Sequence, residues 1–208
     1  MTEYLVVFDV DSTLIEDEVI ELLADVAGKR DQVAAVTERA MAGELDFAQS
    51  LIERVATLAG LPESVFADVQ QRITITTGAK ETIAAIQAAG GKVGAVSGGF
   101  IQLLTPLAAE LNLDFARANE LEVVDGHLTG KVLGKIIDKQ AKADALSEWS
   151  ASAGITNTVA VGDGANDLEM MAQADLGVAF NAKPIVREKA DVVIEGNDLR
   201  KLLELLNI

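Results

Sequence analysis

The feature that most constrains the fold of this chain is an apolar run near its start that leads into two aspartates. Residues 4–8 are Tyr-Leu-Val-Val-Phe, and Asp9 and Asp11 follow, separated by one valine. An apolar run bounded by polar residues is typical of a strand buried on both faces of a parallel sheet. Because side chains two apart on a strand point the same way, we expect Asp9 and Asp11 to face one site.

Two carboxylates at the carboxyl end of a buried strand lie where open α/β sheets bind their ligands. They repel each other unless a proton or a cation relieves the repulsion. Mg²⁺ is the expected cation, since it prefers carboxylate and carbonyl oxygens. An alternative stays open: the pair ends a strand in solvent, and Ser12 and Thr13 form a turn or a helix cap.

Composition excludes several classes of protein. The chain has 208 residues, of which half are hydrophobic, so it can form a sizeable core. It has no cysteine, which excludes disulfides and thiolate chemistry. The net charge of -16 and the lack of a basic cluster argue against a nucleic-acid partner. Without a long apolar run or a basic leader we expect a cytoplasmic protein with no membrane association. The sequence leaves open whether it is a monomer or a homodimer.

Residues 15–74 predict helices and no strand. The apolar spacing favours helices over residues 18–26, 32–42 and 47–59, which end at Gly28, Gly43 and Gly60. A fourth helix is expected to begin at residues 61–63. This block is too long for an ordinary connection between two strands. We therefore expect a helical cap of residues 15–74, inserted into an α/β core of residues 1–14 and 75–208.

Strands and helices alternate again after residue 75, which predicts a doubly wound, mostly parallel, Rossmann-like sheet. The expected strands include residues 92–96, 158–161, 176–179 and 192–194. Asp125-Gly126, between two alternating runs, predicts a β-hairpin.

Further reactive groups follow the predicted strands or lie on a predicted helix. Two glycines after Ser97 at an expected helix start would offer backbone amides to a phosphate, and the glycines around Asp163 allow close approach of a metal. Each group alone has an ordinary alternative, such as a plain turn or a surface lysine. A parallel sheet would bring them to one rim. They are Ser97-Gly98-Gly99, Lys142, and Asp163 with Asn166 and Asp167.

The chain resembles the haloacid dehalogenase superfamily in four motifs, which occur in order over essentially its whole length. They are Asp9-Val10-Asp11-Ser12-Thr13, Ser97-Gly98-Gly99, Lys142, and Gly162-Asp163-Gly164-Ala165-Asn166-Asp167. Further stretches are similar to the phosphoserine phosphatase branch of that superfamily. They are Glu18, residues 41–47, Arg54 and residues 118–121.

The resemblance implies a Mg²⁺-dependent phosphoric monoester hydrolase that converts O-phospho-L-serine to L-serine and phosphate, the last step of serine biosynthesis. Asp9 would be the nucleophile that forms an aspartyl phosphate. Asp11 would protonate the leaving oxygen and then activate water. One Mg²⁺ per site would be held by the carboxylates of Asp9 and Asp163 and by the backbone carbonyl of Asp11.

The same resemblance implies how the substrate is bound. Glu18 would meet its ammonium group and Arg54 its carboxylate, a task that suits the planar guanidinium. The residues implied to hold the phosphoryl group, shape the shell around it or line the pocket are Ser97, Gly98, Lys142, Asn166, Asp167, Met41 and Phe47. With the nucleophile at residue 9, the N-terminal regulatory region of some family members is not expected here.

Two alternatives remain at this stage. The chain could act on another small phosphomonoester such as phosphohomoserine, or transfer the phosphoryl group to another alcohol. It could also be a signalling receiver, which likewise uses an acidic cluster, Mg²⁺ and an aspartyl phosphate. The acid at Asp11 and the helical cap argue against a receiver.

Overall fold

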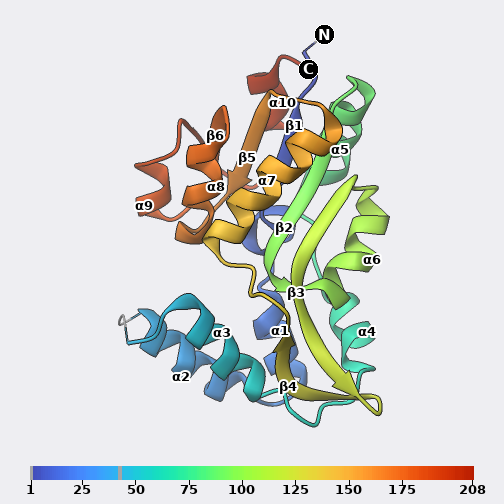
Figure 1. The fold of residues 1–208 in the computed structure, drawn as a ribbon, viewed down its shortest axis with the longest axis vertical. Helices are drawn as coiled ribbons and strands as arrows, with labels where there is room; N and C mark the ends of the chain where they lie inside the picture. Colours follow the sequence, from blue (N-terminus) through green and yellow to red (C-terminus); the bar gives the residue numbers. More distant parts are fainter. Residues whose placement is uncertain (1, 42–43) are drawn as a thin grey trace.

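The computed structural model describes residues 2–41 and 44–208, and it is built on a seven-stranded sheet (Figure 1). The strand order is β4-β3-β2-β1-β5-β6-β7, and all neighbours are parallel except β3 and β4. This arrangement confirms the predicted fold class. The strands are β1 (Leu5–Phe8), β2 (Lys92–Phe100), β3 (Phe115–Val124), β4 (His127–Leu133), β5 (Thr158–Gly162), β6 (Leu176–Phe180) and β7 (Val192–Ile194).

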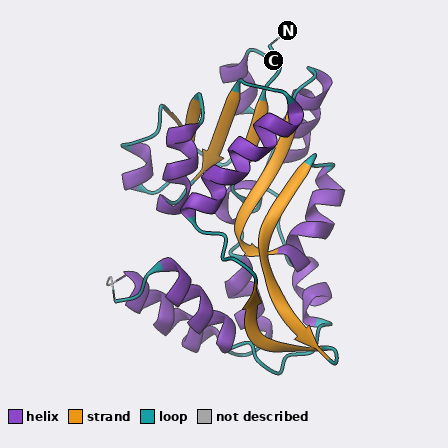
Figure 2. Ribbon diagram, in the orientation of Figure 1, coloured by secondary structure: helices purple, strands orange, loops and turns teal. Residues whose placement is uncertain are grey.

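Helices cover both faces of the parallel part of the sheet, as Figure 2 shows. Val6 and Phe8 point into a core shared with α5 (Ala79–Ala88), α6 (Ile101–Leu111) and α10 (Lys201–Leu206). Leu5 and Val7 point into a second core against α7 (Lys139–Ala153), α8 (Leu168–Gln173) and α9 (Pro184–Arg187). All four side chains of β1 are fully buried, as expected for a strand covered on both faces.

Residues 15–74 are here called the helical segment. Its described residues, 15–41 and 44–74, form four helices: α1 (Val19–Val26), α2 (Arg30–Met41), α3 (Phe47–Ala56) and α4 (Val65–Gln70). They lie beyond the carboxyl ends of the parallel strands (Figure 1). A bridge between Ile15 and Ile75 joins the two ends of the segment. The predicted second helix ran to Ala42, which lies outside the described residues. None of the helices in the described ranges has the length and apolar character that a membrane span requires.

The hairpin was predicted correctly at its turn. Asp125 and Gly126 both have positive φ, 50° and 74°, which matches the type I′ turn that Asp-Gly favours. The strand β3 begins at Phe115, before the alternating run of residues 120–124 that predicts the first strand of the hairpin. Its first half pairs in parallel with β2, and its second half pairs with β4 in the antiparallel sense.

The hairpin is bonded to the helical segment as well as to the sheet. Leu128 accepts a backbone hydrogen bond from Gly60 and donates one to Leu61, each at 2.8 Å. Glu63 donates to the carbonyl of Gly126 at 2.8 Å. Pro62 therefore belongs to this junction, and α4 begins at Val65 rather than near residue 62 as predicted.

Two local predictions near the carboxyl ends of the strands were wrong. Strand β2 continues through Ser97 and the two glycines to Phe100, so these residues do not begin a helix; the register against β3 shifts between Val96 and Phe100, a bulge that glycine permits. Strand β1 ends at Phe8 rather than at Asp11. The chain then turns, because Ser12 adopts a left-handed conformation with φ of 59°.

Candidate active site

A cavity of about 140 Å³ lies at the carboxyl ends of β1, β2 and β5, facing the helical segment. It brings together most of the predicted site residues. These are Asp9, Asp11, Glu18, Phe47, Arg54, Ser97, Gly98, Asp163 and Asn166. Lys142 and Asp167 lie behind its wall, and the side chain of Met41 is outside the described part of the chain.

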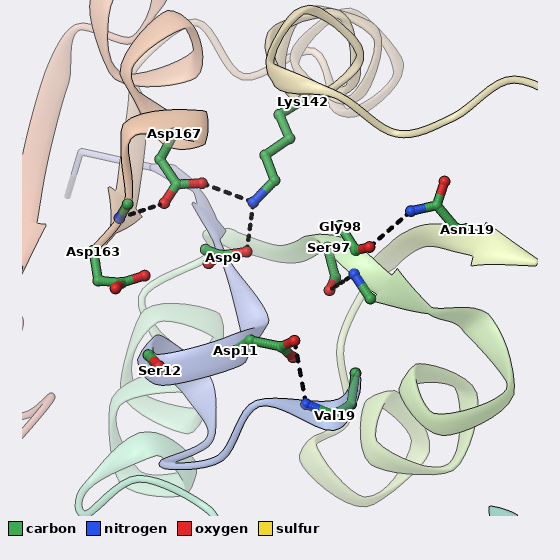
Figure 3. A network of polar contacts seen from close by, with 12 residues as sticks. Asp9, Asp11, Ser12, Val19, Ser97, Gly98, Asn119, Lys142, Asp163 and Asp167 are labelled. Atoms are coloured by element: carbon green, nitrogen blue, oxygen red, sulfur yellow. Dashed lines mark hydrogen bonds and ion pairs between the residues drawn. The ribbon is translucent and has the colours of Figure 1, made fainter. Parts of the chain in front are cut away.

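Lys142 lies at the centre of a buried ion network below the cavity (Figure 3). Its ammonium group donates to Asp9 Oδ1 at 2.5 Å and to Asp167 Oδ1 at 2.7 Å, and the lysine is fully buried. The other oxygen of Asp167 accepts from the backbone amide of Gly164 at 3.1 Å. Lys142 thus links Asp167, from the motif after β5, to Asp9, the candidate nucleophile.

Burial controls the charge of this network. Burial by itself would lower the pKa of Lys142, but the carboxylates of Asp167 and Asp9 raise it above its ordinary value. Burial, followed by the charge of Asp167, raises the pKa of Asp9 to about 7, and Lys142 opposes that rise. Lys142 therefore stays protonated and supplies a permanent counter-ion to Asp9.

Three acids converge closely enough to hold a metal ion. Asp9, Asp163 and Asp167 each offer an oxygen, and these oxygens lie within 4.8 Å of one another. Burial raises the pKa of Asp163 to about 6; the carboxylates of Asp167 and Glu18 add to the rise, and Lys183 and Lys142 oppose it. This donor set of hard oxygens, short of positive charge, fits a divalent cation such as Mg²⁺.

Asp11 reaches the same cavity from the turn after β1. Its Oδ2 accepts a long bond, 3.4 Å, from the amide of Val19, and its Oδ1 is buried without a hydrogen-bond partner among the described residues. Burial raises the pKa of Asp11 well above its ordinary value, and the carboxylates of Glu18 and Asp9 add to the rise. Asp11 therefore holds a proton more readily than an exposed aspartate does.

The bulge of β2 is held by two side-chain bonds. Ser97 Oγ accepts from the amide of Gly99 at 2.7 Å. Asn119, which is only 1% exposed, donates to the carbonyl of Gly98 and accepts from the amide of Ile137, both at 2.8 Å. Asn119 thus ties the glycine bulge to the loop that precedes α7.

The opposite wall of the cavity comes from the helical segment. Glu18 accepts a hydrogen bond from the hydroxyl of Ser12 at 2.7 Å, which fixes its carboxylate near the turn after β1. Arg54 is half-buried on α3, and its Nε donates to the carbonyl of Ser50 at 3.2 Å. Burial lowers the pKa of Arg54, and nearby carboxylates, led by that of Glu18, oppose the change. The cavity therefore has one anionic and one cationic group on this wall.

Sequence reasoning missed two residues of this region. Asn119 belongs to the stretch of residues 118–121 that resembles the family, but the sequence assigned it no role. Its hydrogen bonds to Gly98 and Ile137, which are distant in the chain, could not be predicted from the sequence. Lys183 lines the cavity and lies 3.6 Å from Asp163. One signal for it exists in the sequence, namely that it follows a buried strand of the parallel sheet, as the recognised motifs do.

The chain is similar to known phosphatases. The profile of the haloacid dehalogenase-like hydrolase family matches residues 6–172. Over 209 residues the chain is 54% identical to the phosphoserine phosphatase SerB2 of Mycobacterium tuberculosis, spanning 100% of this chain and 51% of that protein. It is 52% identical to the phosphoserine phosphatase of Streptococcus thermophilus, spanning 98% of this chain and 95% of that one. A solved structure described as a phospho-aspartyl intermediate analogue of phosphoserine phosphatase has a TM-score of 0.91 and 44% identity, and 99% of each chain is covered.

Proposed function

Because the chain belongs to the haloacid dehalogenase-like hydrolase family, we propose that it hydrolyses O-phospho-L-serine to L-serine and phosphate. The observation that carries the proposal is the make-up of one cavity. Asp9 and Asp11 lie on its sheet side, and Glu18 and Arg54 lie on its helical side. A phosphomonoester that also carries an ammonium and a carboxylate group matches both sides.

Asp9 is the proposed nucleophile. Lys142 holds its Oδ1, so Oδ2 is the atom that would attack phosphorus and form the aspartyl phosphate. The bond from phosphorus to the serine oxygen breaks as the new bond forms. The positive charge of Lys142 would stabilise the negative charge that develops around the transferring group.

Asp11 is the proposed acid and base. Its raised pKa favours the protonated carboxyl that the first step needs, because the leaving serine oxygen must receive a proton. The resulting carboxylate would then take a proton from the water that attacks the aspartyl phosphate. Asp11 would thereby return to its starting state when phosphate is released.

A divalent cation, proposed to be Mg²⁺, would be held by Asp9 and Asp163, with the carbonyl of Asp11 as a further ligand. When bound, it would neutralise phosphoryl charge and orient that group for attack. Asp167 belongs to the same acidic cluster, but both of its oxygens already accept hydrogen bonds, from Lys142 and Gly164. We propose that Asp167 holds Lys142 in place and that Asn166 shapes the shell around the phosphoryl group.

Substrate choice is assigned to the helical segment, which we propose acts as a cap over residues 1–14 and 75–208. Glu18 would bind the ammonium of serine and Arg54 its carboxylate. Ser97 and the amide of Gly98 would bind phosphoryl oxygens, and Phe47 would exclude water. Gly98 packs closely against Phe47, because a Cβ atom at position 98 would lie only 2.9 Å from the phenyl ring. A cytoplasmic location and the role in serine biosynthesis remain predictions.

The test is phosphate release from a panel of small phosphomonoesters, with Mg²⁺ and with EDTA. The panel holds L- and D-phosphoserine, phosphothreonine, phosphohomoserine, a sugar phosphate and p-nitrophenyl phosphate. We expect a strong preference for L-phosphoserine that EDTA abolishes. Preference for phosphohomoserine or a sugar phosphate would keep the chemistry and refute the roles given to Glu18 and Arg54. Unchanged activity in EDTA would refute the metal.

A further inference from the structure

Asp163 differs from the other acids of the site in how its charge is balanced. Asp9 and Asp167 share the buried ammonium of Lys142. Among the ion pairs of the described residues, the only one made by Asp163 is with Lys183, whose Nζ lies 3.6 Å from Oδ2. None of the hydrogen bonds among the described residues involves the carboxylate of Asp163.

The backbone of Lys183 is held in place, whereas its side chain is largely exposed to solvent. Its amide donates to the carbonyl of Asp163 at 3.0 Å, and Pro184 follows at the first turn of α9 with its restricted φ. The side chain of Lys183 is nevertheless 66% exposed, against 11% for that of Asp163. The ammonium can therefore move into solvent without disturbing the loop.

We propose that Lys183 is an exchangeable counter-ion of Asp163, which lies beside the carboxylate in the cation-free protein and withdraws when a divalent cation binds. The proposal rests on the divalent-cation site of the proposed function. Two cations next to one carboxylate repel each other, so Lys183 lowers the affinity of the site for the metal. It thereby keeps the bound metal exchangeable.

The expected size follows from the exposure of the pair. A partly exposed ion pair is screened by water, and such pairs are worth less than a buried one. Removing the charge of Lys183 should therefore tighten Mg²⁺ binding by about two- to fivefold. The effect should shrink at high ionic strength, because salt screens exposed charges.

The experiment is isothermal titration calorimetry of Mg²⁺ alone into the EDTA-stripped chain of residues 1–208. The variants are Lys183→Gln and Lys183→Arg, and the matched control is Lys189→Gln. Lys189 is exposed, and the ion pairs of the described residues do not include it, so its loss changes the net charge equally without touching Asp163. Circular dichroism spectra check that each variant is folded.

Tighter binding in Lys183→Gln, with Lys183→Arg and Lys189→Gln close to the unmodified chain, would support the proposal. Equal tightening in Lys189→Gln would assign the effect to net charge and overturn it. Mg²⁺ binding that is unchanged or weaker in Lys183→Gln would also overturn it and leave the proposed function intact. No Mg²⁺ binding by the unmodified chain would refute the metal site itself, and this inference with it.

Discussion

Replacing Asn119 with leucine should lower the free energy of unfolding by more than the loss of one hydrogen bond would. Leucine has a similar size but leaves the carbonyl of Gly98 and the amide of Ile137 without the side-chain partner they now have at 2.8 Å. A buried polar group left unpaired costs about 1–3 kcal/mol. Both partners are only partly buried, so we expect the lower part of the combined range, about 2–4 kcal/mol in the free energy of unfolding.

The assay is urea unfolding followed by the fluorescence of Trp149, the only tryptophan, which is buried against β2. Asn157→Leu is the matched control, because Asn157 is exposed and donates one bond of 3.1 Å to the carbonyl of Glu3. Its loss should cost less than about 1 kcal/mol. Linear extrapolation gives both values, provided that the slopes agree.

A second variant separates the two bonds of Asn119. Asn119→Asp keeps an acceptor for the amide of Ile137 but places a carboxylate oxygen against the carbonyl of Gly98. It should therefore lower the turnover number through the glycine bulge, even where enough stability remains for folding. If Asn119→Leu costs no more than Asn157→Leu, the tie between the bulge and the loop before α7 is not energetically important, and the reasoning fails.

Three further predictions concern chemistry, specificity and pH. Asp9→Asn should abolish phosphate release while the circular dichroism spectrum stays unchanged; near-normal turnover would refute the covalent step. Arg54→Ala should raise KM for L-phosphoserine at least tenfold, worth about 1.4 kcal/mol, but leave p-nitrophenyl phosphate hydrolysis nearly unchanged; equal losses on both would contradict the carboxylate role. Burial alone would raise the pKa of Asp114, but bonds from Lys92, Val93 and Gln87 lower it overall. Its carboxylate should therefore stabilise the fold above the ordinary aspartate pKa of about 3.9, and the difference in unfolding free energy from Asp114→Asn should shrink as pH falls below that value; a difference that grows on acidification would reverse the sign.

The middle of the sheet was predictable because β1 and β5 are buried on both faces. The uninterrupted apolar runs of β1 and β5 can only be covered by two layers of helices, and each run leads to an acid at the same rim of the sheet. The place of Asp11 could not be derived in this way. It depends on the left-handed turn at Ser12, a conformation that a serine rarely adopts and that the local sequence does not demand.

The remaining misses share another cause, namely contacts between distant parts of the chain. Ser97 and its glycines have the composition of a helix start, yet pairing with β3 extends β2 to Phe100. The ion pair of Lys183 with Asp163 joins the loops after two neighbouring strands. Local patterns indicate which residues are reactive, but the neighbouring strands decide which of them meet.

The bonds between the hairpin and the helical segment also bear on how such a protein could be altered or recombined. Deleting residues 15–74 would remove the hydrogen-bond partners of Leu128 and Gly126 and the helix α3 that packs against β4. A variant that lacks the helical segment but keeps the hairpin would therefore expose the edge strand β4 and tend to aggregate. A unit exchanged between relatives would therefore have to include both the helical segment and the hairpin of β3 and β4, which are separate in sequence.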